Sequence, residues 1–315
     1  MSAKKPRVVA DSPDMMVLEF LADRVELLPW EVTVSGADDV DGIYTYSHPH
    51  TNGAIMDRLP GIRIISNYGV GVDHINVKDA ADRGIPVGHT PGVLNGATAD
   101  MGMALLLAAG RRLADGDRYA RSPQFLVHDP GFMWGHEVHS STLGIVGMGA
   151  IGQTVAKRAK AFDMDILYYN RRRRPEAEEA VGATYASLDE LLAKSDYVML
   201  CCPLTAETQG LIGAAELAKM KPTATLVNIA RGGVVDTQAL YEALRDKVIW
   251  SAGLDVTDPE PLPRDHPILK LDNVTIVPHL GSATLQTRSK MAENSVENLM
   301  RGLRGEALLN QAPVL

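Results

Sequence analysis

The sequence has few of the features that mark secreted, membrane-spanning or nucleic-acid-binding proteins. Only two cysteines occur in 315 residues, Cys201 and Cys202, and a structural disulfide between such neighbours would be strained. No apolar run approaches the length that crosses a bilayer, and the N-terminus lacks the apolar segment of a signal peptide. The formal net charge is −8, so positive charge is not in excess. We expect a cytoplasmic protein whose main partner is neither a nucleic acid nor a membrane.

Short apolar segments alternate with helix-length segments, a pattern typical of parallel α/β sheets. The first series of expected strands covers residues 7–10, 31–34, 43–46, 62–66 and 86–90. The second covers residues 143–146, 166–169, 197–202, 225–229, 250–254 and 274–277, with a short extra candidate at 183–186. The chain length favours two domains. We interpret the helical run 98–112 as the crossover between them, and the apolar spacing in 287–303 predicts a last helix that returns to the first domain.

A glycine motif follows the first strand of the second series. The strand runs into Gly147-x-Gly149-x-x-Gly152, and a helix-compatible segment comes next. Glycine at these positions permits a tight turn, brings the backbone close to a pyrophosphate and lets the helix pack on the sheet, while the helix N-terminus offers N–H groups to the anion. The motif predicts a dinucleotide site in which Gly147, Met148, Gly149, Ala150, Ile151 and Gly152 line the turn.

The sequence has no carboxylate where such sites usually read the ribose. That position falls at Asn170, 18 residues after Gly152, and four arginines follow it, Arg171 to Arg174. Guanidinium groups match a phosphate, so Asn170, Arg171 and Arg172 predict NADP(H), with NAD(H) as the weaker alternative. A solvated surface run or a nucleic-acid patch is the competing interpretation of the arginines.

Three polar residues follow candidate strands of the second series, where open α/β sheets place their ligands. They are Arg231, Glu260 and His279. Each alone is more commonly a surface, loop or structural residue. Together they suit the reduction of a 2-oxo acid: the arginine holds the acid, the histidine donates a proton to the carbonyl oxygen, and the carboxylate favours the charged imidazolium near neutral pH. This chemistry needs no metal, and the other histidines have no spacing that suggests a metal site.

An ordered set of motifs resembles the D-2-hydroxyacid dehydrogenases, and within them the glyoxylate/hydroxypyruvate reductases. The motifs are residues 67–73 (NYGVGVD), the glycine turn, 228–233 (NIARGG), 253–256 (GLDV), 259–263 (PEPLP) and 278–284 (PHLGSAT). The resemblance implies a doubly wound Rossmann cofactor domain, residues 99–287, and a flavodoxin-like parallel α/β substrate domain, residues 1–98 and 288–315. It also implies reduction of glyoxylate and hydroxypyruvate to glycolate and D-glycerate.

The resemblance also assigns roles to individual residues. Arg231 would orient the substrate, and Glu260 would pair with His279, the proton donor. Asp255 would approach the nicotinamide carboxamide, and Ser282 would line the substrate pocket. Val70 and Gly71 would present N–H groups to the substrate carboxylate, although their spacing fits an ordinary tight turn equally well.

The family further implies a homodimer formed through the cofactor domains. Residues 98–140 would form an arm, from which Trp134 or Phe132 reaches the partner's substrate pocket. Two other functions stay open. One is a reductase with a broader choice of 2-oxo acids, and the other is a dinucleotide-sensing interaction protein, like the family's transcriptional corepressor relatives.

Overall fold

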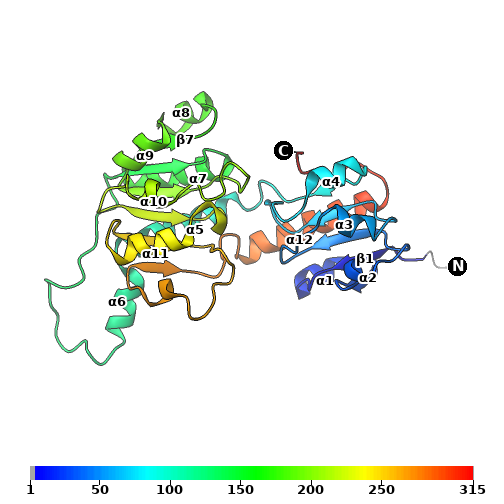
Figure 1. The fold of residues 1–315 in the computed structure, drawn as a ribbon, viewed down its shortest axis with the longest axis horizontal. Helices are drawn as coiled ribbons and strands as arrows, with labels where there is room; N and C mark the ends of the chain where they lie inside the picture. Colours follow the sequence, from blue (N-terminus) through cyan, green and yellow to red (C-terminus); the bar gives the residue numbers. More distant parts are fainter. Residues whose placement is uncertain (1–3, 315) are drawn as a thin grey trace. The chain divides into compact units, whose positions relative to one another are not determined.

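The computed structural model describes residues 4–314 and divides the chain into two compact units. One unit contains the described residues up to Leu94 and those from Thr284 onward, and the other runs from Asn95 to Ala283. Each unit has one parallel sheet with helices packed on it (Figure 1). Among residues 4–314, no helix combines the length and apolar character that crossing a bilayer would demand.

The first unit has a five-stranded sheet in the order β2-β1-β3-β4-β5, which is the order of flavodoxin-like sheets. Its strands are β1 (Arg7–Ala10), β2 (Glu26–Pro29), β3 (Gly42–Thr45), β4 (Ile65–Asn67) and β5 (Val87–Gly88). Its helices are α1 (Met15–Leu21), α2 (Val32–Ser35), α3 (Gly53–Asp57), α4 (Val77–Asp82) and α12 (Leu285–Leu303).

The last helix, α12, is tied to this sheet by buried polar contacts. The Tyr44 and Ser295 hydroxyls lie 2.8 Å apart, and the Ser66 hydroxyl donates to the Ser295 carbonyl at 2.6 Å. The Asn298 amide donates to the His89 carbonyl at 3.0 Å. Because buried polar groups are costly unless paired, these bonds fix the register of α12 on the sheet.

One predicted strand of this unit is wrong. The β-branched residues 32–34 favour an extended segment, but they form the single helical turn α2, and the strand in this region is β2. The Thr33 hydroxyl donates to the Trp30 carbonyl at 2.7 Å, and Val34 is exposed. The edge strand β2 ends at Pro29, where a missing N–H is tolerated. Tertiary position therefore overrides local propensity here.

The second unit has a seven-stranded sheet in the order β12-β11-β10-β9-β6-β7-β8. Its strands are β6 (Thr142–Val146), β7 (Asp165–Tyr169), β8 (Ala183–Tyr185), β9 (Tyr197–Leu200), β10 (Thr225–Asn228), β11 (Ser251–Leu254) and β12 (Val274–Ile276). Its α-helices are α5 (Asn95–Gly110), α6 (Leu113–Ala120), α7 (Ala150–Ala159), α8 (Pro175–Val181), α9 (Leu188–Lys194), α10 (Ala214–Leu217) and α11 (Thr237–Arg245). Three short 3₁₀ turns cover Lys160–Phe162, Gly232–Val234 and Pro267–Lys270.

This strand order confirms the predicted doubly wound fold, because the chain runs outward from β6 in one direction and then outward from β9 in the other. Both faces of the sheet are buried. Along β9, Val198 and Leu200 belong to one core cluster while Tyr197 and Met199 belong to a second. Alternate side chains of a strand point to opposite faces, so each cluster fills one helix-covered layer.

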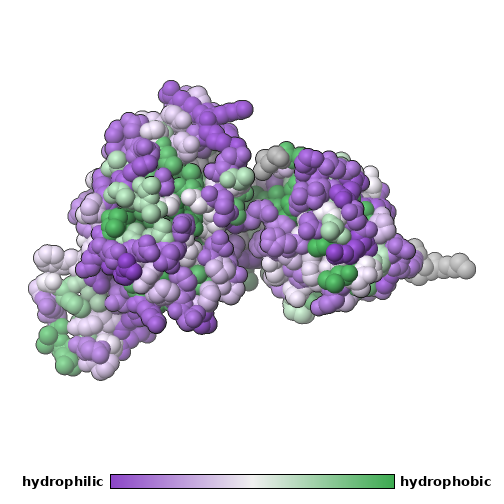
Figure 2. Space-filling model, in the orientation of Figure 1, coloured by the Kyte–Doolittle hydropathy of each residue, from purple (hydrophilic) through white to green (hydrophobic). Residues whose placement is uncertain are grey.

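The segment between α5 and β6 has little regular structure beyond α6 and exposes apolar side chains. We call residues 113–140 the arm, which is shorter than the expected 98–140 because residues 95–110 form the largely buried helix α5. Phe125, Leu126 and Val127 are consecutive and half or more exposed, and Trp134 is 72% exposed. In Figure 1 the arm extends away from the sheet of its own unit, and Figure 2 shows apolar surface at its far end.

Candidate functional site

The candidate residues of the second unit gather at one edge of its sheet. Because all strand pairs are parallel, their carboxyl ends share this edge. The glycine turn follows β6, and the arginines follow β7. Arg231, Glu260 and His279 come after β10, β11 and β12, which are neighbours in the sheet.

The three glycines of the turn differ in how much room surrounds them. Gly147 has φ +104°, and a Cβ there would lie 2.6 Å from the Cys202 nitrogen. A Cβ on Gly152 would overlap the Gly147 carbonyl oxygen, whereas one on Gly149 would meet nothing within 4 Å. Gly149 is also the N-cap of α7 and gives it no side-chain cap. The open position at Gly149 and the uncapped helix start fit a dinucleotide pyrophosphate.

Asn170 connects the end of β7 to the glycine turn. Its side-chain oxygen accepts the Met148 N–H at 2.8 Å, which fixes both segments against each other. Met148 itself is fully buried in the core, and its N–H is engaged by Asn170. No carboxylate occupies the Asn170 position, which removes the usual acceptor for a ribose 2′-hydroxyl.

The structure divides the four arginines into two pairs. Arg173 donates to both oxygens of Glu178 at 2.7 Å each, and Arg174 lies 3.5 Å from Glu176. Arg171 and Arg172 are exposed, and within residues 4–314 neither forms an ion pair. Only this second pair has guanidinium groups not already held by a carboxylate.

Arg231 lies on a tight turn whose shape is set by its neighbours. The Asn228 side chain accepts from the Ala230 N–H at 3.0 Å and donates to the Arg231 carbonyl at 2.9 Å. A Cβ on Gly232 would overlap the Thr257 backbone. This close approach brings the Arg231 turn against the loop that carries Glu260.

Glu260 and His279 form a direct pair. His279 Nδ1 lies 2.8 Å from Glu260 Oε1, and both side chains are about a third exposed. Burial alone would raise the pKa of Glu260, but the hydrogen bond and charge of His279, with smaller help from Arg231, hold this pKa below its ordinary value. The carboxylate is therefore ionised at neutral pH. The imidazole therefore faces the carboxylate through Nδ1, and Nε2 is its second ring nitrogen.

Asp255 holds the backbone of the His279 segment. Its carbonyl accepts the His279 N–H at 2.9 Å, and its carboxylate accepts the N–H groups of Leu280 at 2.6 Å and Gly281 at 2.9 Å. His279 has φ +54°, an unfavourable value for a residue with a side chain, and these bonds hold it there. Burial raises the pKa of Asp255. Ser282, the next residue after Gly281, is partly exposed.

In the first unit, Val70 and Gly71 follow β4 on a turn whose carbonyls are all engaged. Asn67 donates to the Gly69 and Gly71 carbonyls at 3.1 and 2.8 Å, and His89 Nδ1 lies 3.0 Å from the Val70 carbonyl. Among the described residues, the N–H groups of Val70 and Gly71 have no acceptor. Two successive N–H groups of this kind suit an anion.

Cys201 and Cys202 are free thiols behind the glycine turn. Burial raises the pKa of both, that of Cys202 to about 11, so neither is a thiolate at neutral pH. Within the described part of the chain, no three histidine, cysteine or acidic residues gather as a metal site.

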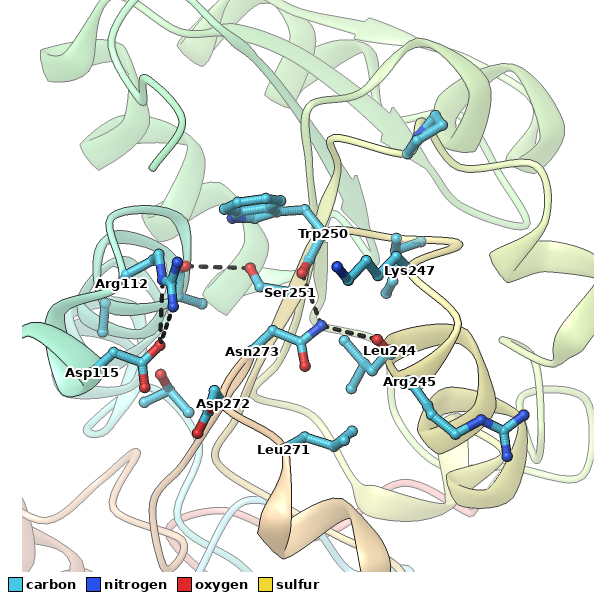
Figure 3. Close-up of a pocket in the computed structure, with 15 residues that line it drawn as sticks. Arg112, Asp115, Leu244, Arg245, Lys247, Trp250, Ser251, Leu271, Asp272 and Asn273 are labelled. Atoms are coloured by element: carbon cyan, nitrogen blue, oxygen red, sulfur yellow. Dashed lines mark hydrogen bonds and ion pairs between the residues drawn. The ribbon is translucent and has the colours of Figure 1, made fainter. Parts of the chain in front are cut away.

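A cavity of about 460 Å³ lies at the opposite edge of the sheet (Figure 3). Its lining includes Trp250 and Ser251 at the amino end of β11, Asn273 beside β12, and the Arg112–Asp115 ion pair. In a parallel sheet the amino ends of strands lie away from the carboxyl ends. This cavity is therefore distinct from the edge that carries Glu260 and His279.

Sequence reasoning missed several residues that shape the site. Asn228 and Gly232 lie inside the quoted motifs, but the motifs do not reveal their contacts. Tyr168 and Glu178 flank the arginines, and the acidic first turn of α8 was the signal that some of the guanidinium groups are neutralised locally.

Comparisons with known proteins agree with this geometry. A family model described as D-isomer specific 2-hydroxyacid dehydrogenase, NAD binding domain, matches residues 103–281. A glyoxylate reductase of Korarchaeum cryptofilum is 47% identical over 90% of this chain and 87% of its own length. A glyoxylate reductase of Thermococcus gammatolerans is 47% identical over 89% of this chain and 84% of its own.

A solved structure with the same fold comes from Sinorhizobium meliloti. It is an NADPH-dependent glyoxylate/hydroxypyruvate reductase in complex with NADP and malonate, with a TM-score of 0.90 and 31% identity. The alignment covers 99% of this chain and 98% of that chain.

The second and third glycines of the turn give a matched pair of variants. Gly152→Ala forces a Cβ into the Gly147 carbonyl, so we expect it to lower the free energy of unfolding by about 1–3 kcal/mol, the usual cost of overpacking. Gly149→Ala should leave the melting temperature unchanged and weaken dinucleotide binding. Thermal melts and cofactor titrations check both. Equal destabilisation by the two variants would contradict the division of roles.

Proposed function

The chain belongs to the D-isomer specific 2-hydroxyacid dehydrogenases, and from that membership we propose that it is an NADPH-preferring reductase of small 2-oxo acids. Its proposed substrates are glyoxylate and hydroxypyruvate, and its products glycolate and D-glycerate. The observation that carries the proposal is the Glu260–His279 pair beside the Arg231 turn, at the edge of the sheet that also carries the glycine turn. The names of the similar reductases support the same substrate class.

The proposed chemistry assigns one task to each side chain. A bound nicotinamide would supply the hydride that reaches the carbonyl carbon. His279 gives the proton on Nε2 to the carbonyl oxygen, so that C=O becomes CH–OH. Glu260 stabilises the imidazolium from the Nδ1 side, and Arg231 binds the substrate carboxylate as a cation with paired donors. We place Asp255 near the nicotinamide carboxamide and Ser282 beside the substrate.

The first unit has a proposed part in substrate binding as well. The N–H groups of Val70 and Gly71, which have no acceptor within residues 4–314, are suited to a carboxylate and need no side chain for this role. We therefore assign the first unit to the substrate and the second to the coenzyme. Free thiols at Cys201 and Cys202 fit a reducing compartment, in which we place the enzyme as a cytoplasmic protein.

The cofactor and substrate proposals share one experiment. Glyoxylate, hydroxypyruvate, pyruvate and phenylpyruvate are each assayed with NADPH and with NADH. Because neither Arg171 nor Arg172 forms an ion pair with a carboxylate within residues 4–314, we expect kcat/KM to favour NADPH by roughly ten- to several-hundred-fold. Arg171→Ala and Arg172→Ala should each reduce this ratio, whereas Arg174→Ala serves as the control. A preference for NADH would defeat the cofactor claim, and equal rates with phenylpyruvate would favour a broader reductase.

The acid–base pair predicts two separable effects. His279→Gln should lower turnover by ~10²–10⁴-fold while NADPH binding persists. The Glu260 pKa lies below its ordinary value, so the carboxylate stays ionised throughout the neutral range and beyond it as pH falls. Glu260→Gln should therefore lower kcat across this range, because a neutral amide does not stabilise positive charge on the imidazole during proton transfer.

The matched control is Asp258→Asn, which removes an exposed carboxylate from the same loop. It should leave kcat unchanged. Protein that binds NADPH but reduces none of the acids would instead favour a dinucleotide-sensing role.

We also propose a homodimer in which the arm contacts a partner subunit. Its support is the exposed apolar surface of the arm, which would be costly in water. Phe132 packs on the Tyr119 ring at 4.7 Å within the arm, whereas Trp134 is the more exposed aromatic, so we favour Trp134 as the residue that reaches the partner.

A valine pair tests the dimer. Val127 and Val34 are 75% and 74% exposed, the first in the arm and the second on α2. Val127→Glu should convert a mass of two chains to one in light scattering, and Val34→Glu should not. A wild-type protein with the mass of a single chain would disprove the dimer.

A further inference from the structure

The loop that carries the arginines is fixed at its first residue. We call residues 170–174 the arginine loop. The Asn170 side chain accepts the Met148 N–H at 2.8 Å, and the Asn170 carbonyl accepts the Tyr185 hydroxyl at 3.2 Å. The loop therefore begins from a point tied both to the glycine turn and to β8.

The other end of the arginine loop is fixed by Tyr168. This side chain is fully buried, and its hydroxyl accepts the Arg174 N–H at 2.7 Å. The same hydroxyl donates to Glu178 Oε1 at 2.6 Å. The Tyr168 ring also packs edge-on against Tyr185, with 5.4 Å between centroids. One buried phenol thus links the backbone of the loop to the first turns of α8.

Glu178 also contacts the arginine loop, and it binds Arg173, which leaves this arginine unavailable to a phosphate. It binds Arg173 through both oxygens at 2.7 Å each. The hydrogen bonds from Arg173 and then Tyr168 lower the pKa of Glu178 to about 2, so the ion pair persists across the pH range of an enzyme assay. Arg173 is therefore held on α8.

These contacts leave Arg171 and Arg172 between two fixed points. We propose that Tyr168 and Glu178 are positioning residues of a 2′-phosphate site: they hold the arginine loop so that Arg171 and Arg172 face the ribose phosphate, and they keep Arg173 away from it. This inference rests on the proposed NADPH preference and names the residues that make it possible. A loop ordered before binding loses less conformational entropy when the phosphate arrives.

The test compares Tyr168→Phe and Glu178→Gln with wild type. Affinities are measured by calorimetric titration with NADPH, NADH, 2′,5′-ADP and ADP. Without the hydroxyl the Arg174 N–H loses its acceptor, so Tyr168→Phe should weaken NADPH and 2′,5′-ADP binding about 10-fold and leave NADH and ADP within about 2-fold. Glu178→Gln should weaken the binding of NADPH and 2′,5′-ADP about 3-fold. Asp246→Asn is the matched control, since Asp246 also binds an arginine, Arg245, at 2.7 Å through both oxygens.

A second measurement tests whether the arginine loop becomes less ordered. Hydrogen exchange of the Arg174 amide, measured without ligand, should accelerate in Tyr168→Phe and not in Asp246→Asn. If wild type prefers NADPH and Tyr168→Phe keeps the full preference, this inference fails while the proposed function stands. If wild type has no preference for NADPH, the cofactor proposal fails and this inference fails with it. Should Tyr168→Phe not fold, Glu178→Gln decides the question alone.

Discussion

The candidate site depends on the buried carboxylate of Asp255. One residue accepts three successive N–H groups, those of residues 279, 280 and 281, and thereby sets the path of the chain after β12. The imidazole meets Glu260 because the backbone of His279 is held at a positive φ that a free chain would avoid. Burial of the Asp255 carboxylate costs free energy, which the two hydrogen bonds from Leu280 and Gly281 offset. The geometry of the partly exposed Glu260–His279 pair thus depends on Asp255, which is buried.

A second constraint is steric and lies between loops. The missing side chain at Gly232 lets the Arg231 turn approach the Thr257 backbone, and the Thr237 hydroxyl donates to the Asp258 carbonyl at 2.7 Å. The loops after β10 and β11 are therefore one packed layer. The charge of Arg231 contributes to the lowered pKa of Glu260.

The sequence predicted the architecture well because its signals are local. Apolar strand segments, the glycine turn and the parallel α/β alternation identified the doubly wound sheet, even the short strand β8. It failed at residues 32–34, where an edge position decided the structure, and it did not anticipate α6. Strand ends indicated where Arg231, Glu260 and His279 would gather. The Asp255 bonds and the Tyr168–Glu178 connection depend on three-dimensional neighbours, so no spacing along the chain reveals them.

The order of strands in the second sheet separates the proposed coenzyme-binding residues from the proposed acid–base residues. The residues proposed to bind the adenosine end of a coenzyme follow β6 and β7, on one side of β9, whereas the proposed acid–base residues follow β10, β11 and β12 on the other. Substitutions at a few positions after β7 can therefore change the preferred coenzyme without altering the residues proposed to transfer protons. The fold allows these two properties to evolve separately.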